Sequence, residues 1–248
     1  MAHDDMRLLI DDPTVRAVEI KLTVRGDQDH LVRSALERPN VAPLHRRVYF
    51  MDRQDLSWFD SGLVIRVRRT EGAPDDLTVK LRPVVPAEIG DDWKERDDFS
   101  IEVDVVGTTR VCSAKLAVEP TPQAVDGVLT GEREPQALLS ADQTRLIAEH
   151  APVDANWTDW IGIQPLGPIE VDIWDVHPAG FDHPITVEEW VLPDGTDLIE
   201  LSSGVAPEDA ARADEELRAY LRGLGLDVDG DQQTKARTAL YSLTGRRR

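Results

Sequence analysis

Hydrophobic and polar residues alternate along eight stretches of the chain. Successive side chains of a β-strand point to opposite faces, so this alternation is the pattern expected of strands. The stretches are rich in β-branched residues and are flanked by turn-forming residues. The pattern therefore predicts eight strands, at residues 16–24, 46–52, 62–70, 76–83, 97–106, 167–176, 184–192 and 196–202.

Helical periodicity occurs between and after these strands. It predicts helices within residues 27–39, 140–150, 207–226 and 231–245. The segment at about 106–167 is interpreted as an insertion of helix and loop, and residues 1–14 as an N-terminal tail. Because no linker or repeat interrupts the rest, we expect residues 15–248 to form one domain that ends in the C-terminal helices.

Most of the predicted strands have one aliphatic face and one face with ionisable groups. In the first strand Glu19 and Lys21 share a face, and in the third Arg66 and Arg68 do so. The corresponding faces of three other strands carry Lys80 and Arg82, Glu102 and Asp104, and Glu200. Acids and bases thus recur together on strand after strand.

Two architectures would bury the aliphatic faces. In a sandwich these faces meet one another and the charges are solvated. In a closed barrel the charged faces point inward, and helices cover the aliphatic faces outside. Basic residues two positions apart, as in Arg66 and Arg68, line a surface with parallel donors suited to phosphate oxygens. This spacing, and the helices that need an apolar surface, favour the barrel.

The net charge of −19, from 47 acidic and 28 basic residues, argues against nucleic-acid binding, which needs a basic surface. A small anion could still bind where bases gather and metal ions offset the acids. The fractions of hydrophobic (41%) and charged (30%) residues are those of a folded, soluble protein. The chain has neither a membrane-length apolar run nor a signal peptide, so we expect a cytoplasmic protein without a membrane partner.

Several stretches in this order resemble the CYTH family, or triphosphate tunnel metalloenzymes. They are "AVEIKLTV", "VYFMDRQDLSWFDSGLVIRVRR", "LTVKLRP", "SIEVDV", "LIELS" and "QTKARTAL". The resemblance runs from about Val15 to Leu240. The family includes class IV adenylate cyclases, thiamine triphosphatases and inorganic triphosphatases.

The resemblance implies an α+β fold, a closed eight-stranded antiparallel β-barrel with helices packed on its outside. It implies Mg²⁺ or Mn²⁺ as cofactor and hydrolysis of a triphosphate, with inorganic triphosphate as the default substrate. By position, the triphosphate-binding residues would be Lys21, Arg66, Arg68, Lys80 and Arg82. The metal ligands would be Glu19, Glu102, Asp104, Glu200 and Glu188, and the catalytic residues Lys235 and Glu19.

Two departures from the family pattern keep alternatives open. Ala17 stands where the opening motif has a glutamate, and the sixth predicted strand carries Glu170 and Asp172 where the family commonly has a basic residue. A phosphate- or polyphosphate-binding module without turnover is therefore one alternative, and a class IV-type adenylate cyclase is another. The chain would act as a monomer or a homodimer.

Overall fold

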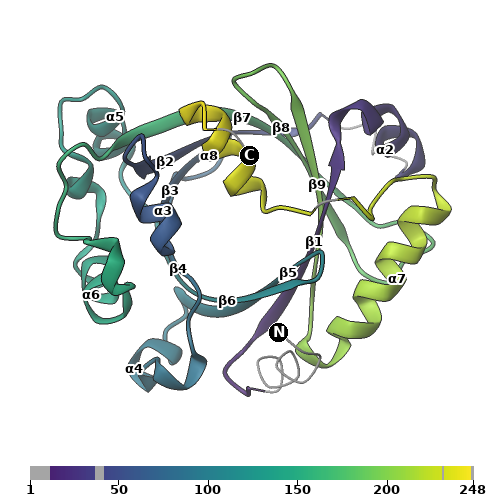
Figure 1. Ribbon diagram of the computed structural model, residues 1–248, viewed down its shortest axis with the longest axis horizontal. Helices are drawn as coiled ribbons and strands as arrows, with labels where there is room; N and C mark the ends of the chain where they lie inside the picture. The colour runs from purple at the N-terminus through teal and green to yellow at the C-terminus, as the bar shows by residue number, and fades with distance from the viewer. Residues whose placement is uncertain (1–11, 37–41, 231, 247–248) are drawn as a thin grey trace.

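The computed structural model describes residues 12–36, 42–230 and 232–246, and within them the strands form a closed barrel (Figure 1). The order around the barrel is β1-β5-β6-β4-β3-β2-β7-β8-β9. The strands are β1 (Ala17–Arg25), β2 (Leu44–Asp52), β3 (Leu63–Thr70), β4 (Asp76–Leu81), β5 (Phe99–Val106), β6 (Thr109–Val118), β7 (Gln164–Val176), β8 (Ile185–Val191) and β9 (Asp197–Val205).

The α+β barrel class is confirmed, but the predicted strand count and the purely antiparallel pairing are wrong. The described residues form nine strands, and β1 pairs with β5 in parallel. The additional strand, β6, forms a hairpin with β5 in which Val106 faces Thr109. The sequence did not predict β6 because its small residues, such as Ser113 and Ala114, have weak strand propensity. Gly107, with φ of +60° in the two-residue turn, was the signal that could have found it.

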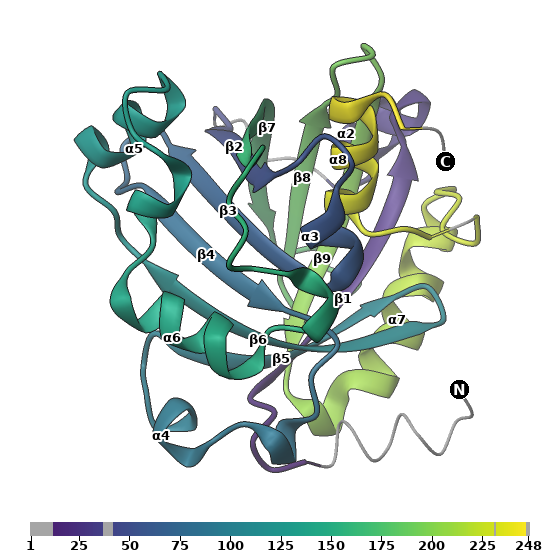
Figure 2. The ribbon, with the colours of Figure 1, turned by 60° about the vertical axis from the view of Figure 1, so that its left-hand side comes forward.

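Helices cover two sides of the barrel (Figures 1 and 2). On one side lie α2 (Asp29–Ala35) and α7 (Ala210–Gly223), and on the other α4 (Asp91–Lys94), α5 (Pro122–Leu129) and α6 (Ala141–His150). The remaining α-helices are α3 (Ser57–Ser61) and α8 (Lys235–Thr244). The 3-10 helices are η1 (Gly26–Gln28), η2 (Pro86–Glu88), η3 (Pro135–Leu138), η4 (Val153–Ala155) and η5 (Pro207–Asp209). No helix within the described ranges is long and apolar enough to cross a membrane.

The aliphatic faces of several strands point outward and are buried beneath these helices. Val18, Ile20 and Leu22 of β1 are inaccessible to solvent and belong to the same apolar cluster as Leu217 and Leu221 of α7. Their strand neighbours Glu19 and Lys21 therefore face the barrel interior. Of the two architectures, the barrel with inward charges is the one that forms.

The interior is apolar on the side of β2, β7 and β8. Phe50, Ile173 and Trp190 form a second cluster with Leu240 and Tyr241 of α8, which lies across this part of the barrel (Figure 1). Burial of these residues fixes α8 over the interior, with its first residue, Lys235, among the charged groups.

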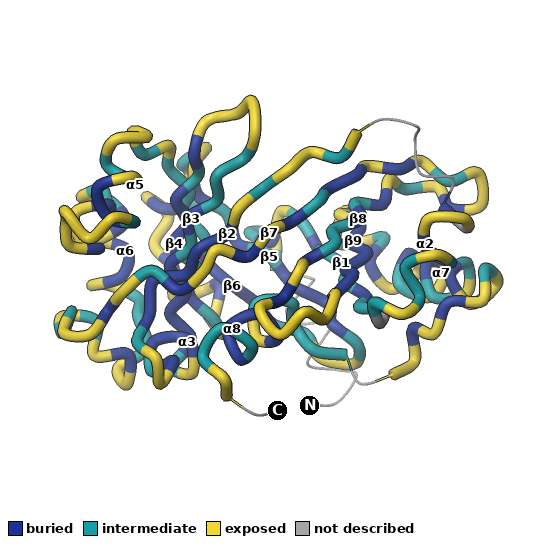
Figure 3. The backbone as a smooth tube through the Cα atoms, turned by 90° about the horizontal axis from the view of Figure 1, so that it is seen from above, coloured by how far each residue is buried: buried dark blue, intermediate teal, exposed yellow. Residues whose placement is uncertain are grey.

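The acids of β7 lie outside the tunnel. Because Ile173 and its neighbours face inward, the alternating residues Glu170 and Asp172 face outward. Glu170 is exposed, and Asp172 contacts the His45 imidazole. Figure 3 shows the neighbouring backbones of β2 and β7, coloured by the burial of each residue. The acidic strand thus does not add negative charge to the interior, contrary to the interpretation of the sequence.

Candidate functional site

Charged side chains from five strands and one helix line a cavity of about 60 Å³ inside the barrel. The cavity brings together seven of the predicted site residues, namely Lys21, Arg66, Lys80, Arg82, Asp104, Glu200 and Lys235. Phe50, Val64 and Ala236 form its apolar wall. The alternation of the strands is the cause of this convergence, because inward positions of neighbouring strands lie side by side in a closed barrel.

Asp104 is the centre of one group of charges. Its two carboxylate oxygens each accept a hydrogen bond of 2.6 Å, one from Lys21 Nζ and one from Lys80 Nζ. Burial acts to raise the pKa of Asp104, but the charges of the two lysines outweigh it and hold the pKa well below its usual range. Glu19 joins the group through Lys21 Nζ at 2.8 Å. These contacts keep Asp104 ionised in a buried place.

Glu102 extends this group toward β6. Its carboxylate accepts hydrogen bonds from Lys115 Nζ at 2.8 Å and from Ser100 Oγ at 2.9 Å, and it lies 3.7 Å from Lys80 Nζ. Burial opposes ionisation, but the charges of Lys115 and Lys80 lower the pKa of Glu102. Glu19 and Glu102 therefore do not line the cavity themselves and contact it through its lysines.

Lys235 joins a second pair of acids. Its ammonium lies 2.7 Å from both Glu188 and Glu200, which face each other on β8 and β9. Trp190 Nε1 donates to the other oxygen of Glu188 at 2.8 Å. Burial raises the pKa of Glu200, whereas for Glu188 the charge of Lys235 outweighs burial and lowers the pKa to about 2. Lys235 thus ties α8 to the charged interior.

Three arginines of the interior have no carboxylate within ion-pair distance among the described residues. They are Arg46, Arg66 and Arg82. Arg66 Nε is buried without a hydrogen-bond partner, and burial together with the charge of Arg68 lowers the pKa of Arg66 to about 10. Arg82 lies over the ring of Phe59. Arg68, which was also predicted to bind phosphate, forms an ion pair with Asp76 at 2.9 Å.

Sequence reasoning missed two interior bases. Arg46 shares a face with Val48 and Phe50. Because most of this face is apolar, the sequence did not indicate that Arg46 points inward. The charge of Arg46 is one of the causes that lower the pKa of Arg66. Lys115 belongs to β6, the strand that was not predicted. The alternation in "HRRVYF" was the available signal for Arg46, since it places Arg46 and Arg47 on opposite faces.

The predicted metal ligands separate into two groups around different lysines. No group of three or more His, Cys, Asp or Glu residues in the described part of the chain is arranged to hold an ion. Glu188 and Glu200, however, both contact one ammonium, so they can share a single cation. Mg²⁺ is commonly bound by one or two carboxylates together with substrate phosphates and water. These two residues therefore fit a divalent ion that a bound phosphate completes.

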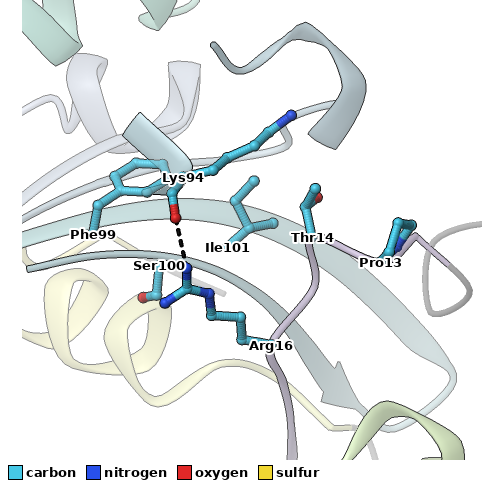
Figure 4. Close-up of a pocket in the computed structure, with 7 residues that line it drawn as sticks. All are labelled: Pro13, Thr14, Arg16, Lys94, Phe99, Ser100 and Ile101. Carbon is cyan, nitrogen blue, oxygen red and sulfur yellow. Dashed lines mark hydrogen bonds between the residues drawn. The ribbon is translucent and has the colours of Figure 1, made fainter. Parts of the chain in front are cut away.

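A second cavity, of about 150 Å³, lies between the start of β1, α4 and the start of β5 (Figure 4). Arg16 donates a hydrogen bond of 2.6 Å to the backbone carbonyl of Lys94. The ammonium of Lys94 extends away from the guanidinium of Arg16 (Figure 4). Because the two cations do not converge, the interior cavity is the better candidate for an anion site.

Comparison with known proteins identifies the fold. No protein-family model and no curated protein matches the sequence. Among solved structures, the chain is similar to a Hippeastrum protein described as an adenylyl cyclase with a dominant triphosphatase activity. The TM-score is 0.59 at 16% identity, and the match covers 90% of this chain and 94% of that one. A Bacillus halodurans protein described as an adenylate cyclase has a TM-score of 0.59 at 12% identity, with 90% and 96% of the two chains covered. The resemblance to the CYTH family is thereby confirmed at the level of the fold.

Proposed function

On the premise that the chain has the CYTH tunnel fold, we propose that its cavity binds a triphosphate and hydrolyses it with Mg²⁺ or Mn²⁺. The observation that carries this proposal is the set of interior arginines without a carboxylate partner. The chain has a net charge of −19, and surface arginines such as Arg96 and Arg222 are paired with aspartates. In such a chain, unpaired guanidinium groups inside the barrel are best explained by an external anion.

The electrostatics of the cavity support an anion of high charge. Burying an unpaired cation costs free energy, and a bound phosphate chain would supply the missing partners. A triphosphate carries about four negative charges near neutral pH, which several fixed bases can hold. Arg66 and Arg82 would donate to phosphate oxygens directly, and Lys21 and Lys80 would exchange part of their contact with Asp104 for the ligand.

The proposed reaction is attack by water on the terminal phosphorus, with cleavage of the bridging P–O bond. Phosphoryl transfer depends mainly on positioning and on positive charge around the transferred group. Lys235 would donate hydrogen bonds to the phosphate oxygens on which charge develops. Glu19, which contacts the cavity only through Lys21, would accept the proton of the attacking water by way of a second water molecule. Glu188 and Glu200 would hold the divalent ion, which neutralises phosphate charge when bound.

The test is phosphate release from inorganic triphosphate, ATP and thiamine triphosphate, each with and without Mg²⁺ or Mn²⁺. We expect metal-dependent release, fastest with inorganic triphosphate, and a large loss of rate in Lys235→Met. Lys94→Met, at the second cavity, is the matched control and should keep the wild-type rate. A cyclic nucleotide formed from ATP would identify a cyclase instead, and tight binding without any product would identify a binding module.

A further inference from the structure

The segment from Asp52 to Gly62 contacts the cavity through Arg82. It leaves β2, forms the short helix α3 and enters β3, so it connects two neighbouring strands of the barrel. None of its residues belongs to the charged lining of the cavity. Two of its residues nevertheless contact Arg82, Phe59 at the guanidinium and Gly62 at the backbone.

Arg82 is held by an aromatic ring. Its guanidinium carbon lies 5.0 Å from the centre of the Phe59 ring, within the range of a cation–π contact. Within the described residues the Arg82 side chain donates no hydrogen bond, and a guanidinium stacked on a ring keeps its in-plane N–H donors available for another partner. Lys80 contrasts with it, since Asp104 occupies one of its donors and neutralises its charge. Phe59 therefore orients a base while leaving its charge and its hydrogen bonds for another partner.

Asp52 fixes Phe59. Its side chain is buried, and its two oxygens accept hydrogen bonds from the backbone N–H of Trp58 at 3.2 Å and of Phe59 at 2.8 Å. These N–H groups lie in the first turn of α3, where they have no partner within the helix. The carboxylate of Asp52 thus sets the orientation of α3 and, with it, the direction of the Phe59 ring.

At the other end of α3, the backbone of Gly62 packs closely against the backbone of Arg82. Its carbonyl accepts the N–H of Arg82 at 2.9 Å. Its φ is +98°, and a Cβ atom at this position would lie 1.9 Å from the carbonyl oxygen of Arg82. Only glycine permits this approach. Both ends of α3 therefore act on the placement of Arg82.

We propose that Phe59, fixed by Asp52 and Gly62, is a positioning residue that holds the Arg82 guanidinium in the cavity with its donors free for a phosphate oxygen. This inference rests on the proposed function, because it assigns a role toward the anion that the cavity would bind. It also assigns a purpose to the stretch "DRQDLSWFDSG", which supplies none of the residues that line the cavity.

The test is a double-mutant cycle on binding of inorganic triphosphate, measured by calorimetry without metal. Phe59→Leu keeps an apolar side chain but removes the ring, and we expect it to weaken binding about two- to tenfold. Phe59→Tyr keeps the ring and should restore the wild-type affinity. In an Arg82→Met background, Phe59→Leu should have no further effect, because the group that Phe59 orients is already absent.

The outcomes separate this inference from the proposed function. If the wild type does not bind triphosphate, both are overturned. If the wild type binds and Phe59→Leu weakens binding equally in the two backgrounds, or Phe59→Tyr is as weak as Phe59→Leu, only the inference is overturned. If Phe59→Leu does not fold, the question is decided by the NMR signal of the Arg82 Nε–H proton in the wild type. This signal is assigned by its absence in Arg82→Lys. An upfield shift from the ring is expected, and an unshifted signal would overturn the inference.

Discussion

The two halves of the barrel interior are built from the same alternating pattern, yet one is charged and the other apolar. On β1 the aliphatic residues, such as Ile20, face outward beneath α7, and the charged residues face inward. On β7 the aliphatic residues, such as Ile173, face inward beneath α8, and Glu170 faces the solvent. Alternation therefore shows that a strand has two different faces, but the element that covers the strand decides which face points inward.

The division also assigns a different task to each half. The apolar half binds α8 and places Lys235 at the cavity. The charged half supplies Arg66, Arg82 and the lysine–carboxylate groups. Substitutions in the apolar half should therefore change stability first, and substitutions in the charged half should change ligand binding first.

The largest effect on stability is expected for the contact between α8 and the apolar half. Leu240 is buried, and Leu240→Ala should lower the free energy of unfolding by about 2–5 kcal/mol, because it leaves a cavity in this cluster. Urea unfolding followed by circular dichroism measures the change. Leu243, which is only partly buried in the same helix, is the control, and its alanine variant should lose less. Equal losses in both variants would contradict the account.

A smaller effect, with opposite signs in two measurements, is expected for Arg66. Arg66→Ala should weaken triphosphate binding by about 1.5–3 kcal/mol, since it removes a charge-assisted contact. The same change should leave the free energy of unfolding unchanged or raise it, because Arg66 Nε is buried without a partner. Calorimetric titration and urea unfolding of one variant test both statements, and a variant that is destabilised yet binds normally would refute them.

Acid should act on the charged half through Asp104. The pKa of this group is lowered by the charges of Lys21 and Lys80, which outweigh the opposing effect of burial. Its contribution to stability is therefore fully present above about pH 4, where an unfolded aspartate is ionised, and is lost as the pH falls below that value. Asp104→Asn should be less stable at neutral pH and lose less stability between pH 4 and pH 2. Urea unfolding of the wild type and the variant between pH 7 and pH 2 measures this, and parallel curves for the two proteins would contradict the account.

The smallest effect is expected at Ala17, which pairs with Glu102 across the parallel strands. Ala17→Glu adds a carboxylate near Glu19 and Glu102, away from Glu188 and Glu200, so it should tighten the binding of a second Mg²⁺ or Mn²⁺ ion a few-fold in the presence of triphosphate. A metal titration of the two proteins measures this. A variant that is less stable and binds metal no better would mean that this face of the barrel does not take part in metal binding.

Much of the fold could be predicted from sequence, because strong alternation marked the eight strands and the resemblance supplied the barrel. The ninth strand escaped because its small residues carry little strand preference, although Gly107 marked its turn. The cavity bases Arg66, Lys80 and Arg82 were found because each has a second basic residue two positions away in the sequence. Arg46 was not predicted because its inward face continues with the apolar residues Val48 and Phe50.

Which charges pair could not be predicted, because pairing depends on distances across the barrel. Asp104 lies far from Lys21 and Lys80 in sequence yet bonds to both. Likewise, Arg68 and Arg66 look equivalent in "RVR", but Asp76 on the neighbouring strand neutralises only Arg68 by direct contact. The difference between a paired and an unpaired arginine, on which the proposed function depends, appears only in the folded chain.

The central claim is that unpaired arginines inside the barrel bind a triphosphate. It is tested most directly by titrating inorganic triphosphate, without metal, into the wild type, Arg46→Ala and Arg47→Ala in a calorimeter. The two arginines are adjacent on β2, and Arg46 faces the interior while Arg47 faces outward. The account predicts salt-sensitive binding by the wild type, about tenfold or more weakened by Arg46→Ala and unchanged by Arg47→Ala. No binding by the wild type, or the same affinity in both variants, would contradict it.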